Sequence, residues 1–364
     1  MPRIQSANGW PAQNPILLEV MRGGILESVH RGAVAVVDVN GAVRLSLGDI
    51  SWPVSPRSCM KLLGAMPLVE SGAVDAFGLG SVEIALACSS HIGAPLHVDL
   101  ISHWLDKVGL TVADLQCGTH APFSREASDM LVRNGEKPTA LHNNNSGKHV
   151  ALLTTAKHLG EPLDTYLRPD HPAQQRVRRV TEIMTGLDLG TAPEGTDRCG
   201  MPMPALPVHA MARAMARLGR PDTLDPALAA SAGRILDAVR EHPLLLLGPG
   251  KLSTVVNQVT GGRIILKGGS EGTYAGCIPG QGLGFAMKID DGGADRAANI
   301  VVMNLLARIE AFTSDEVERL RGKFARPVLD ARGEQIGVMR PAECLAGEYG
   351  GRRMADPELP RKAA

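Results

Sequence analysis

The chain has 364 residues with 38 lysines and arginines and 38 aspartates and glutamates, so its formal net charge is zero. A neutral chain argues against a nucleic-acid-binding surface or a polybasic membrane patch, and an aromatic content of 3% argues against an RNA-binding protein that stacks bases. The length allows one large domain or two closely joined domains, with a core built mainly from Ala, Leu, Val and Met.

The sequence carries no signal for a membrane or for export. No apolar run reaches the roughly 18–20 residues of a membrane span. Residues 1–14 lack the basic and apolar regions of a signal peptide. The six cysteines are scattered, with no C-x-x-C pair, which is typical of reduced thiols. We therefore expect a cytoplasmic protein with no membrane partner and no nucleic-acid partner.

Strand signals lie near both ends of the chain and helical signals lie between them. Asn40-Gly41, inside the Val- and Leu-rich segment Gly32–Leu47, predicts a β-hairpin. Apolar residues then recur with helical spacing in the segments Val98–Val108, Val150–His158, Arg176–Met184, Ala210–Leu218 and Ala227–Val239. Strands are predicted again at Arg263–Leu266, Thr273–Ile278 and Gly284–Ile289, followed by a helix at Arg296–Ala311 and a strand at Gln335–Met339.

This order predicts a mixed α/β (α+β) fold. Pairing the N- and C-terminal strands in one antiparallel sheet, flanked by helices, hides the strand edges, and the helical middle becomes an inserted subdomain. Alternating βαβ units are absent from the pattern, which argues against a doubly wound sheet. We expect one catalytic unit over residues 15–345, with the sheet from about 15–55 and 260–340 and the helical part from about 90–250. A flexible tail over 346–364 would follow.

The most informative motif is SCMK at residues 58–61, the only S-x-x-K in the chain. A serine and a lysine three positions apart share one face of a helix, where an uncharged lysine amine can take the proton of the serine hydroxyl. Ser55 is the predicted N-cap and Pro56 the predicted first helical residue, so Ser58 falls in the first turn, near free backbone N–H groups. Alone, the motif is expected by chance about once in a chain of this length.

Two polar blocks in the helical middle are further candidates. The block HNNNSGKH at residues 142–149 precedes an apolar helical run, and a helix N-terminus beside lysine and histidine suits a carboxylate. In the loop GTDRCG at residues 195–200, Asp197 is a candidate for a substrate ammonium group and Cys199 for a metal. The structural alternatives are a capped helix in the first block and an Asx-type turn in the second.

Two further candidate functional residues lie where apolar runs end in polar side chains. Lys267 follows a β-run and precedes glycines, so it is either an exposed strand-end lysine or a lysine aimed into a cleft. In a cleft it would lower the pKa of Lys61 by like-charge repulsion. The segment Ala87–His91 ends an apolar run with two hydroxyls, Ser89 and Ser90, and helix capping is its structural interpretation.

Taken together, these blocks resemble the rhizobial-type (class 3) bacterial L-asparaginase family. The matching segments run in the family's order over about residues 15–340: Pro56-Arg57-Ser58 with Lys61, Ala87–His91, His142–Asn144 with Ser146–His149, Gly195–Asp197 with Cys199, His242-Pro243 with Gly248–Gly250, Lys267 with Glu271-Gly272, and Lys288–Gly292. The resemblance implies a fold related to serine β-lactamases and glutaminases. It also implies hydrolysis of L-asparagine to L-aspartate and ammonia by a homodimer.

By motif position, the resemblance implies two catalytic Ser–Lys pairs, Ser58 with Lys61 and Ser90 with Lys267. Our hypothesis is that Ser58 attacks the side-chain amide carbon and that Lys61 is the base, its pKa lowered by burial and by Lys267. Ser90, held by Lys267, would pass a proton to the leaving ammonia. The sequence leaves open which of the two serines is the nucleophile.

Substrate binding is assigned to charged residues of the same blocks. Arg57, Lys148 and His149 are expected to hold the α-carboxylate of the substrate, and Asp197 its α-ammonium group. These assignments follow from the charges that an amino-acid head group carries at neutral pH.

One position departs from the family pattern. Members that bind zinc have a cysteine at the position of Asn145, and their other ligands correspond to Lys148 and Cys199. An amide is a poor substitute for a thiolate on a borderline-soft metal. We therefore expect that zinc is not held in the same way, which leaves weak binding through Cys199 or no metal as the alternatives.

Other functions remain to be separated. A β-lactam-hydrolysing enzyme is expected to carry S-D-N and K-T-G motifs, which this sequence lacks. Glutamine differs from asparagine by one methylene, worth about 1–3 kcal/mol in a pocket, so a glutaminase is an alternative, as is an enzyme acting on β-aspartyl peptides. A non-catalytic amino-acid sensor is the alternative from another class. It would be expected to lose Ser58 or a lysine.

Overall fold

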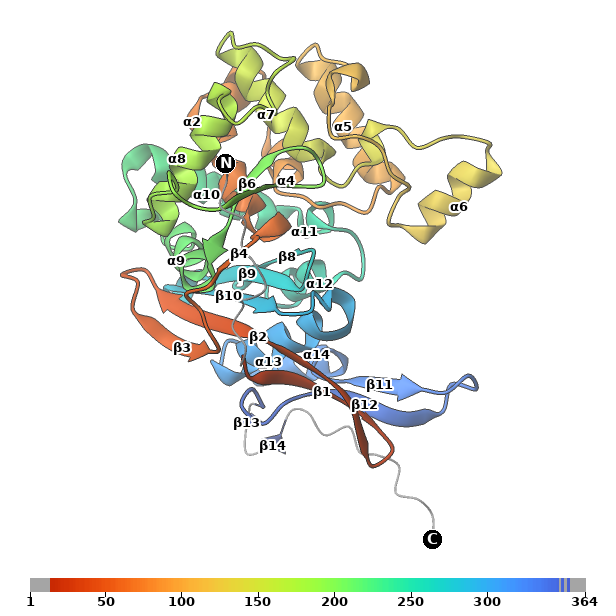
Figure 1. Ribbon diagram of the computed structural model, residues 1–364. Coiled ribbons are helices and arrows are strands. Elements are labelled where there is room, and N and C mark those ends of the chain that lie inside the picture. Colours follow the sequence, from red (N-terminus) through yellow and green to blue (C-terminus); the bar gives the residue numbers. More distant parts are fainter. Residues whose placement is uncertain (1–13, 347, 350–351, 354–364) are drawn as a thin grey trace.

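The computed structural model describes residues 14–346, 348–349 and 352–353 (Figure 1). Within them, no helix is long and apolar enough to cross a membrane. The tail predicted for residues 346–364 lies outside the described residues, except for residue 346 and two short strands, β13 (Glu348–Tyr349) and β14 (Arg352–Arg353). The prediction of a flexible tail therefore stays a prediction.

Strands from both ends of the chain form one antiparallel sheet of eight strands. Its order is β11-β12-β1-β2-β10-β9-β8, and β3 pairs with β2 beside this path. The strands are β1 (Ile16–Arg22), β2 (Ile25–Asp38), β3 (Val43–Leu47), β8 (Ile265–Gly269), β9 (Thr273–Ile278), β10 (Leu283–Ile289), β11 (Arg326–Leu329) and β12 (Gln335–Pro341). The N-terminal strand β2 thus pairs directly with the C-terminal strand β10.

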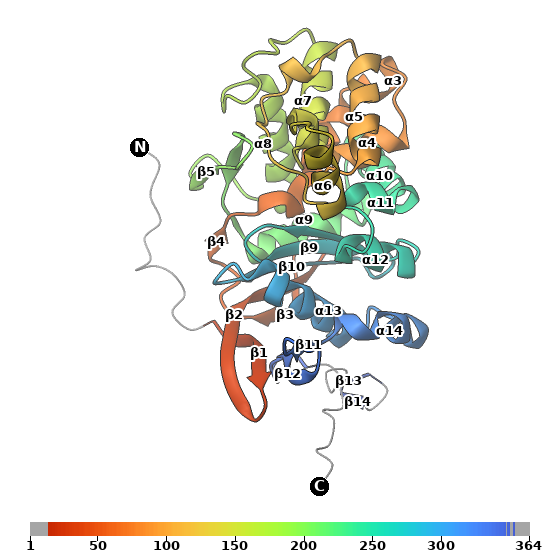
Figure 2. The same cartoon turned by 90° about the vertical axis from the view of Figure 1, so that its right-hand side faces the viewer.

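The two faces of the sheet pack against different helical layers. Along β2, Ala33 and Ala35 point into the core shared with the helical part, whereas Val34 and Val36 point into the core shared with α13 (Asn299–Arg308) and α14 (Ser314–Leu320). This alternation is the two-residue period of a strand buried on both faces. Figure 2 shows β9 and β10 between the helical part and α13 with α14.

Small residues bring helix α9 (Val208–Leu218) close to the sheet. A side chain at Gly284 in β10 would meet the backbone oxygen of Ala212 at 2.0 Å and the backbone nitrogen of Ala216 at 2.3 Å. Only glycine allows this approach of helix backbone to strand backbone. The contact anchors the helical part on the sheet.

The helical part above the sheet contains eleven further helices among the described residues. They are α1 (Lys61–Gly64), α2 (Met66–Glu70), α3 (Ala73–Ala76), α4 (Ser81–Ala87), α5 (Pro95–Lys107), α6 (Arg125–Arg133), α7 (Ser146–His158), α8 (Pro172–Thr185), α10 (Pro226–Glu241), α11 (Pro243–Leu246) and α12 (Leu252–Val259). Two pairs of short strands join it, β4 (Pro53–Val54) with β7 (Leu206–Pro207) and β5 (Glu194–Thr196) with β6 (Pro202–Pro204).

The predicted fold class is confirmed: one antiparallel sheet from both chain ends, flanked by helices, with the helical middle between them. The predicted hairpin at Asn40-Gly41 joins β2 to β3, and the predicted middle helices correspond to α5, α7, α8, α9 and α10. The helix predicted over Arg296–Ala311 is shorter, because a single π-helical turn at Ala294–Ala298 precedes α13. The edge strand β11 and the protruding helix α6 were not predicted.

Candidate active site

A cleft of about 570 Å³ lies between the end of strand β8 and the helical part. Both serines of the predicted pairs line it. The complete lining is Ser58, Ser90, Ile92, Phe123, Asn144, Leu247, Lys251, Leu252, Gly268, Gly269, Ser270, Glu271, Tyr274, Gly292 and Asn299. The cleft therefore combines residues of the N-terminal segment, the helical middle and the C-terminal strands.

Ser58 lies in a short 3-10 helix, η2 (Arg57–Met60), which leads into α1. The predicted capping by Ser55 is wrong: its hydroxyl donates to Met203 Sδ, and Pro56 occupies the N-cap position without a side-chain cap. Arg57 has a φ of +50°, a left-handed conformation that strains a residue with a side chain. Because a 3-10 helix has three residues per turn, Ser58 and Lys61 still share one face.

Glycine at the end of β8 lets this turn rest on the sheet. A side chain at Gly269 would meet Thr273 Oγ1 at 2.3 Å, Arg57 Cβ at 3.1 Å and the backbone nitrogen of Cys59 at 3.2 Å. The turn that carries Ser58 is thus held against the strand that carries Lys267. This contact explains why a Gly-rich sequence follows Lys267 in β8.

Lys61 is buried, and two backbone carbonyl groups hold its side-chain nitrogen in place. Lys61 Nζ donates to the carbonyl oxygen of Ser89 at 2.5 Å and to that of Asn144 at 3.1 Å. A neutral amine has two N–H groups and one lone pair, so these two carbonyls use both N–H groups. In the described part of the chain the hydroxyl of Ser58 makes no hydrogen bond, and the structure records none between Ser58 and Lys61.

The second Ser–Lys pair is in direct contact. Lys267 Nζ donates to Ser90 Oγ at 2.8 Å and to the carbonyl oxygen of Gly268 at 3.2 Å. Lys267 is fully buried in β8, and Ser90 follows α4. The alternative of an exposed strand-end lysine is therefore wrong: Lys267 is buried, and its side chain reaches Ser90, which lines the cleft.

Burial gives Lys61 and Lys267 lower pKa values than an ordinary lysine has. It lowers the pKa of Lys61 well below its usual value, and the neighbouring Lys267 and Lys148 lower it further. Burial also lowers the pKa of Lys267 to about 8. The nearby thiols of Cys59 and Cys88 supply no counter-charge at neutral pH, since burial raises the pKa of each to about 12. Lys61 is thus suited to act as a base, and Lys267 to hold a proton near neutral pH.

A charged pair lies next to Ser58 along the chain. Arg57 Nη1 is 3.2 Å from Asp197 Oδ1, and Cys199 Sγ donates to Asp197 Oδ2 at 3.6 Å. Burial by itself would raise the pKa of Asp197, but Lys148 and Arg57 outweigh it and the pKa is lowered. The structure thus brings together three of the four predicted binding residues, Arg57, Lys148 and Asp197, around one ionised carboxylate.

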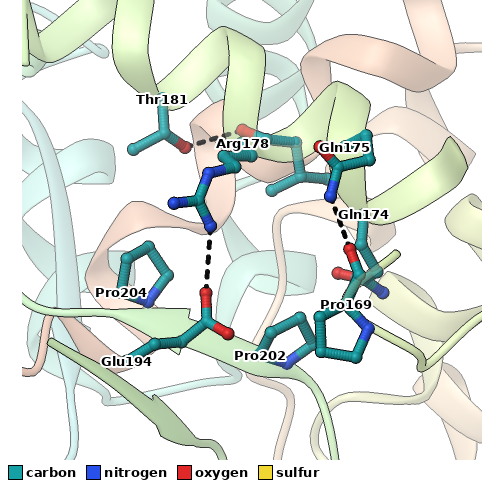
Figure 3. A pocket seen from close by; sticks show the side chains of 9 residues that line it. Pro169, Gln174, Gln175, Arg178, Thr181, Glu194, Pro202 and Pro204 are labelled. Atoms are coloured by element: carbon teal, nitrogen blue, oxygen red, sulfur yellow. Dashed lines mark hydrogen bonds and ion pairs between the residues drawn. The ribbon is translucent and has the colours of Figure 1, made fainter. Parts of the chain in front are cut away.

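The hairpin that carries Asp197 is held by helix α8. Figure 3 shows Arg178 of α8 reaching toward Glu194 of β5, at 3.2 Å. Beside them, Gln175 Nε2 donates to the carbonyl oxygen of Pro169 at 2.6 Å. The pocket between them measures about 40 Å³, close to the space of one water molecule, so it does not suit an amino-acid substrate.

His149, the fourth predicted binding residue, is fully buried and lies outside the lining of the cleft. Its Nδ1 is 2.7 Å from the hydroxyl of Tyr166, which accepts a hydrogen bond from the backbone N–H of Gln116. Burial lowers the pKa of His149 well below its ordinary value, and Lys148 lowers it further, so the imidazole is neutral.

The residues at the family's zinc position do not suit zinc. Asn145 Nδ2 donates to Asn143 Oδ1 at 3.2 Å and to Asn144 Oδ1 at 3.0 Å, while Asn145 Oδ1 is buried without a partner. A lone amide oxygen and the thiol of Cys199 make a weak donor set, because zinc prefers several thiolate or imidazole ligands. Burial raises the pKa of the nearby Cys117 thiol to about 12, so it supplies no thiolate at neutral pH. The described residues contain no group of three or more His, Cys, Asp or Glu side chains able to hold a metal.

Sequence reasoning missed most of the cleft wall. Asn144, whose carbonyl accepts from Lys61, stands inside the predicted polar block, but no role was assigned to it. Phe123, Leu247 and Tyr274 carried no signal, because a cleft wall is assembled from segments far apart in the sequence. The one available signal for a role of Asn144 was its place in the polar block at residues 142–149.

Comparisons with known proteins complete the description. Residues 18–341 match the sequence model of the family described as L-asparaginase II. No curated protein matches the sequence. Among solved structures, the chain is similar to a β-lactamase from Mycobacterium bovis, with 16% identity and a TM-score of 0.40, over 82% of this chain and 96% of that one. It is also similar to a D-alanine carboxypeptidase from Burkholderia cenocepacia, with 14% identity and a TM-score of 0.35, over 75% and 93% of the two chains.

Proposed function

The chain belongs to the L-asparaginase II family, and from this premise we propose that it hydrolyses L-asparagine to L-aspartate and ammonia by acyl transfer. The observation that carries the proposal is the convergence of two buried lysines of lowered pKa on a cleft lined by Ser58 and Ser90. Active sites are where such shifts concentrate, because a base near neutral pH must be uncharged and an acid must hold its proton.

In the proposed first step, Ser58 Oγ attacks the side-chain amide carbon and Lys61 takes the hydroxyl proton. Support comes from Lys61 Nζ, whose two N–H groups have carbonyl partners, so that its lone pair is left for a proton. The C–N bond then breaks. Ser90 passes a proton to the leaving nitrogen and is reprotonated by Lys267, to which it is bonded at 2.8 Å. Water finally hydrolyses the aspartyl ester and frees Ser58.

The head group of the substrate is proposed to bind beside the nucleophile. Arg57 and Lys148 would hold the α-carboxylate, and Asp197 the α-ammonium group. Asp197 is ionised and already paired with Arg57, so the substrate ammonium would share or replace that pair. His149 is a less suitable carboxylate ligand, since its imidazole is neutral and bonded to Tyr166.

The proposal extends to the organisation of the protein. Residues 15–345 act as one catalytic unit, because Lys267 of the sheet and Ser90 of the helical part meet in one hydrogen bond. The family resemblance supports a homodimer, and the sequence supports a cytoplasmic location. Light scattering after size-exclusion chromatography tests the dimer: the mass of a single chain in solution would contradict it.

Ammonia release from asparagine, measured beside glutamine, tests the reaction. We expect asparagine to be the better substrate, and Ser58→Ala to lower kcat by about 10³-fold or more, as for other activated serines. A variant that keeps more than about a tenth of the wild-type kcat would exclude Ser58 as the nucleophile. Preferred release from glutamine would indicate a glutaminase, and binding of asparagine without turnover would indicate an amino-acid sensor.

A further inference from the structure

We infer that the open part of the cleft is a leaving-group subsite, so that the enzyme also hydrolyses N4-substituted L-asparagines that release an apolar primary amine. The inference rests on the proposed function, because it extends the same acyl transfer to a second class of substrate. The supporting observation is that apolar side chains line the open cleft beside Ser58 and Ser90, whereas the charged residues proposed to bind the head group do not line it.

The charged residues that are proposed to hold the head group lie apart from the open cleft. Arg57, Lys148 and Asp197, which are proposed to hold the amino-acid head group, are not among the described residues that line it. Asp197 approaches Arg57 from the loop between β5 and β6, and Asn144 is the lining residue nearest in sequence to Lys148. A substrate whose head group binds these charges presents its amide nitrogen to the open side of the cleft.

The part of the cleft wall that adjoins Ser90 is apolar. The backbone N–H of Ser90 donates to the carbonyl oxygen of Leu246 at 2.9 Å, and that of Ile92 donates to Leu247 at 3.0 Å. These two bonds align the segments side by side, so Ile92 and Leu247 extend the wall directly from the residue that is proposed to protonate the leaving nitrogen.

An aromatic ring and a helix residue complete this apolar wall. Phe123 lines the cleft with 52% of its surface exposed, and its ring stacks on His120 at a centroid distance of 4.7 Å. Leu252, at the start of α12, lines the same space. At the rim, the opposite charges of Lys251 and Glu271 give the cleft no net preference for a charged substituent.

The size of the cleft exceeds what ammonia requires. Ammonia is about as large as water, whose share of liquid volume is about 30 Å³. The cleft is open to solvent on one side and offers about 570 Å³. A benzyl group on the amide nitrogen would fill part of this space and bury apolar surface against Ile92, Phe123 and Leu247, which stabilises the bound state.

The reaction with such a substrate balances without a further reagent. Ser58 Oγ forms a bond to the side-chain carbonyl carbon, the C–N bond breaks, and the nitrogen takes a proton from Ser90 and leaves as a neutral amine. Water then hydrolyses the ester. The products of N4-benzyl-L-asparagine and one water are aspartate and benzylamine.

The test compares L-asparagine with N4-benzyl-L-asparagine on the full chain, measuring the aspartate that both release. We expect kcat/KM for the benzyl substrate to lie within about tenfold of that for asparagine, since apolar contacts offset the greater steric hindrance of the secondary amide. Phe123→Ala should lower the ratio of kcat/KM for the benzyl substrate to kcat/KM for asparagine about tenfold. Leu329→Ala, a similarly exposed apolar side chain on β11, is the matched control and should leave that ratio unchanged.

Three results would overturn the inference. If asparagine is hydrolysed but the benzyl substrate is not, the cleft serves only as solvent access and the proposed function stands. If both substrates are hydrolysed but Phe123→Ala and Leu329→Ala give the same kcat/KM ratio, the benzyl group of the substrate does not bind at this wall. If neither substrate is hydrolysed, the proposed function fails and the inference fails with it.

Discussion

Lys267 Nζ lies 2.8 Å from Ser90 Oγ, although the two residues are 177 positions apart in the sequence. The bond joins β8 at the edge of the sheet to the loop that follows α4 in the helical part. Lys61 reaches the same loop, because it donates to the carbonyl oxygen of Ser89. Two buried lysines thus converge on adjacent residues of one loop, and each depends on the same docking of the helical part on the sheet.

Ser90 and Lys267 should behave as one unit in kinetics. If Ser90 passes the proton that Lys267 holds, then Ser90→Ala and Lys267→Met each break the same relay, and each is expected to lower kcat by about 10²-fold. The double variant should lose no more than either single variant, as groups acting together are not additive. Steady-state ammonia release from the three variants measures this. Losses that multiply in the double variant would show that the two side chains act independently.

The sequence predicted the parts of this arrangement whose signals are local. The hairpin at Asn40-Gly41 depends on turn chemistry within four residues, and the middle helices depend on apolar spacing within about fifteen. Ser58 and Lys61 share a face because they are three positions apart. The capping by Ser55 was predicted wrongly, since Arg57 takes a left-handed backbone conformation that no local pattern indicates, and it lies against Gly269, far along the chain.

The remaining parts depend on contacts between distant segments. The carbonyl partners of Lys61 lie 28 and 83 positions away, and no spacing rule connects them. The pairing of Ser90 with Lys267 came from the family resemblance, because nothing in their own neighbourhoods links the two. The apolar wall at Phe123 carried no local signal either, since a lone aromatic in a loop has many structural uses.

The buried Lys267 should make stability depend on pH in a predictable direction. Its pKa is about 8 in the folded protein and 10.5 in an ordinary environment. Between these values the unfolded chain binds more protons, so the free energy of unfolding rises with pH in this window, and below about 8 the full cost of the buried charge remains. Lys267→Met removes this cost. Relative to wild type, the variant should therefore be most stabilised at pH 7, and the difference should shrink by about 1 kcal/mol at pH 9.

Urea denaturation of both proteins at pH 7, 8 and 9 measures this difference. Taking the difference removes the titration of the buried thiols of Cys59 and Cys88, which is common to both proteins. A stability difference that stays constant across the three pH values would show that Lys267 titrates with an ordinary pKa in the folded state.

Two helical glycines should respond oppositely to alanine. A side chain at Gly147, in the first turn of α7, would lie 2.3 Å from the carbonyl oxygen of Leu86 in α4, so one backbone must move. Gly147→Ala is expected to lower the free energy of unfolding by about 2 kcal/mol. At Gly233, in the middle of α10, nothing lies within 4 Å, and Gly233→Ala should raise it by about 0.5–1 kcal/mol. Equal effects in urea denaturation would contradict the close packing of α7 on α4.

The same substitution at Gly147 should also affect the reaction. Asn144 and Lys148 flank this turn, and Ser90 follows α4, so a shift between α7 and α4 moves groups on both sides of the cleft. We expect Gly147→Ala to lower kcat/KM for asparagine about tenfold, because small misplacements of catalytic groups are costly. Gly233→Ala, the matched control, lies outside the cleft lining and should keep wild-type activity.

The last prediction concerns the metal. In wild type, the amide of Asn145 stands where zinc-binding relatives have a thiolate, and its nitrogen is already bonded to Asn143 and Asn144. Protein purified without chelator should therefore hold well under one zinc per chain by elemental analysis, and chelators should leave its activity unchanged. Asn145→Cys supplies the thiolate that zinc-binding relatives carry at this position and should bring the zinc content toward one per chain. Adding Cys199→Ala to that variant should remove the zinc again, because one thiolate remains. A full equivalent of zinc in wild type would contradict the expectation that an amide at position 145 prevents zinc binding.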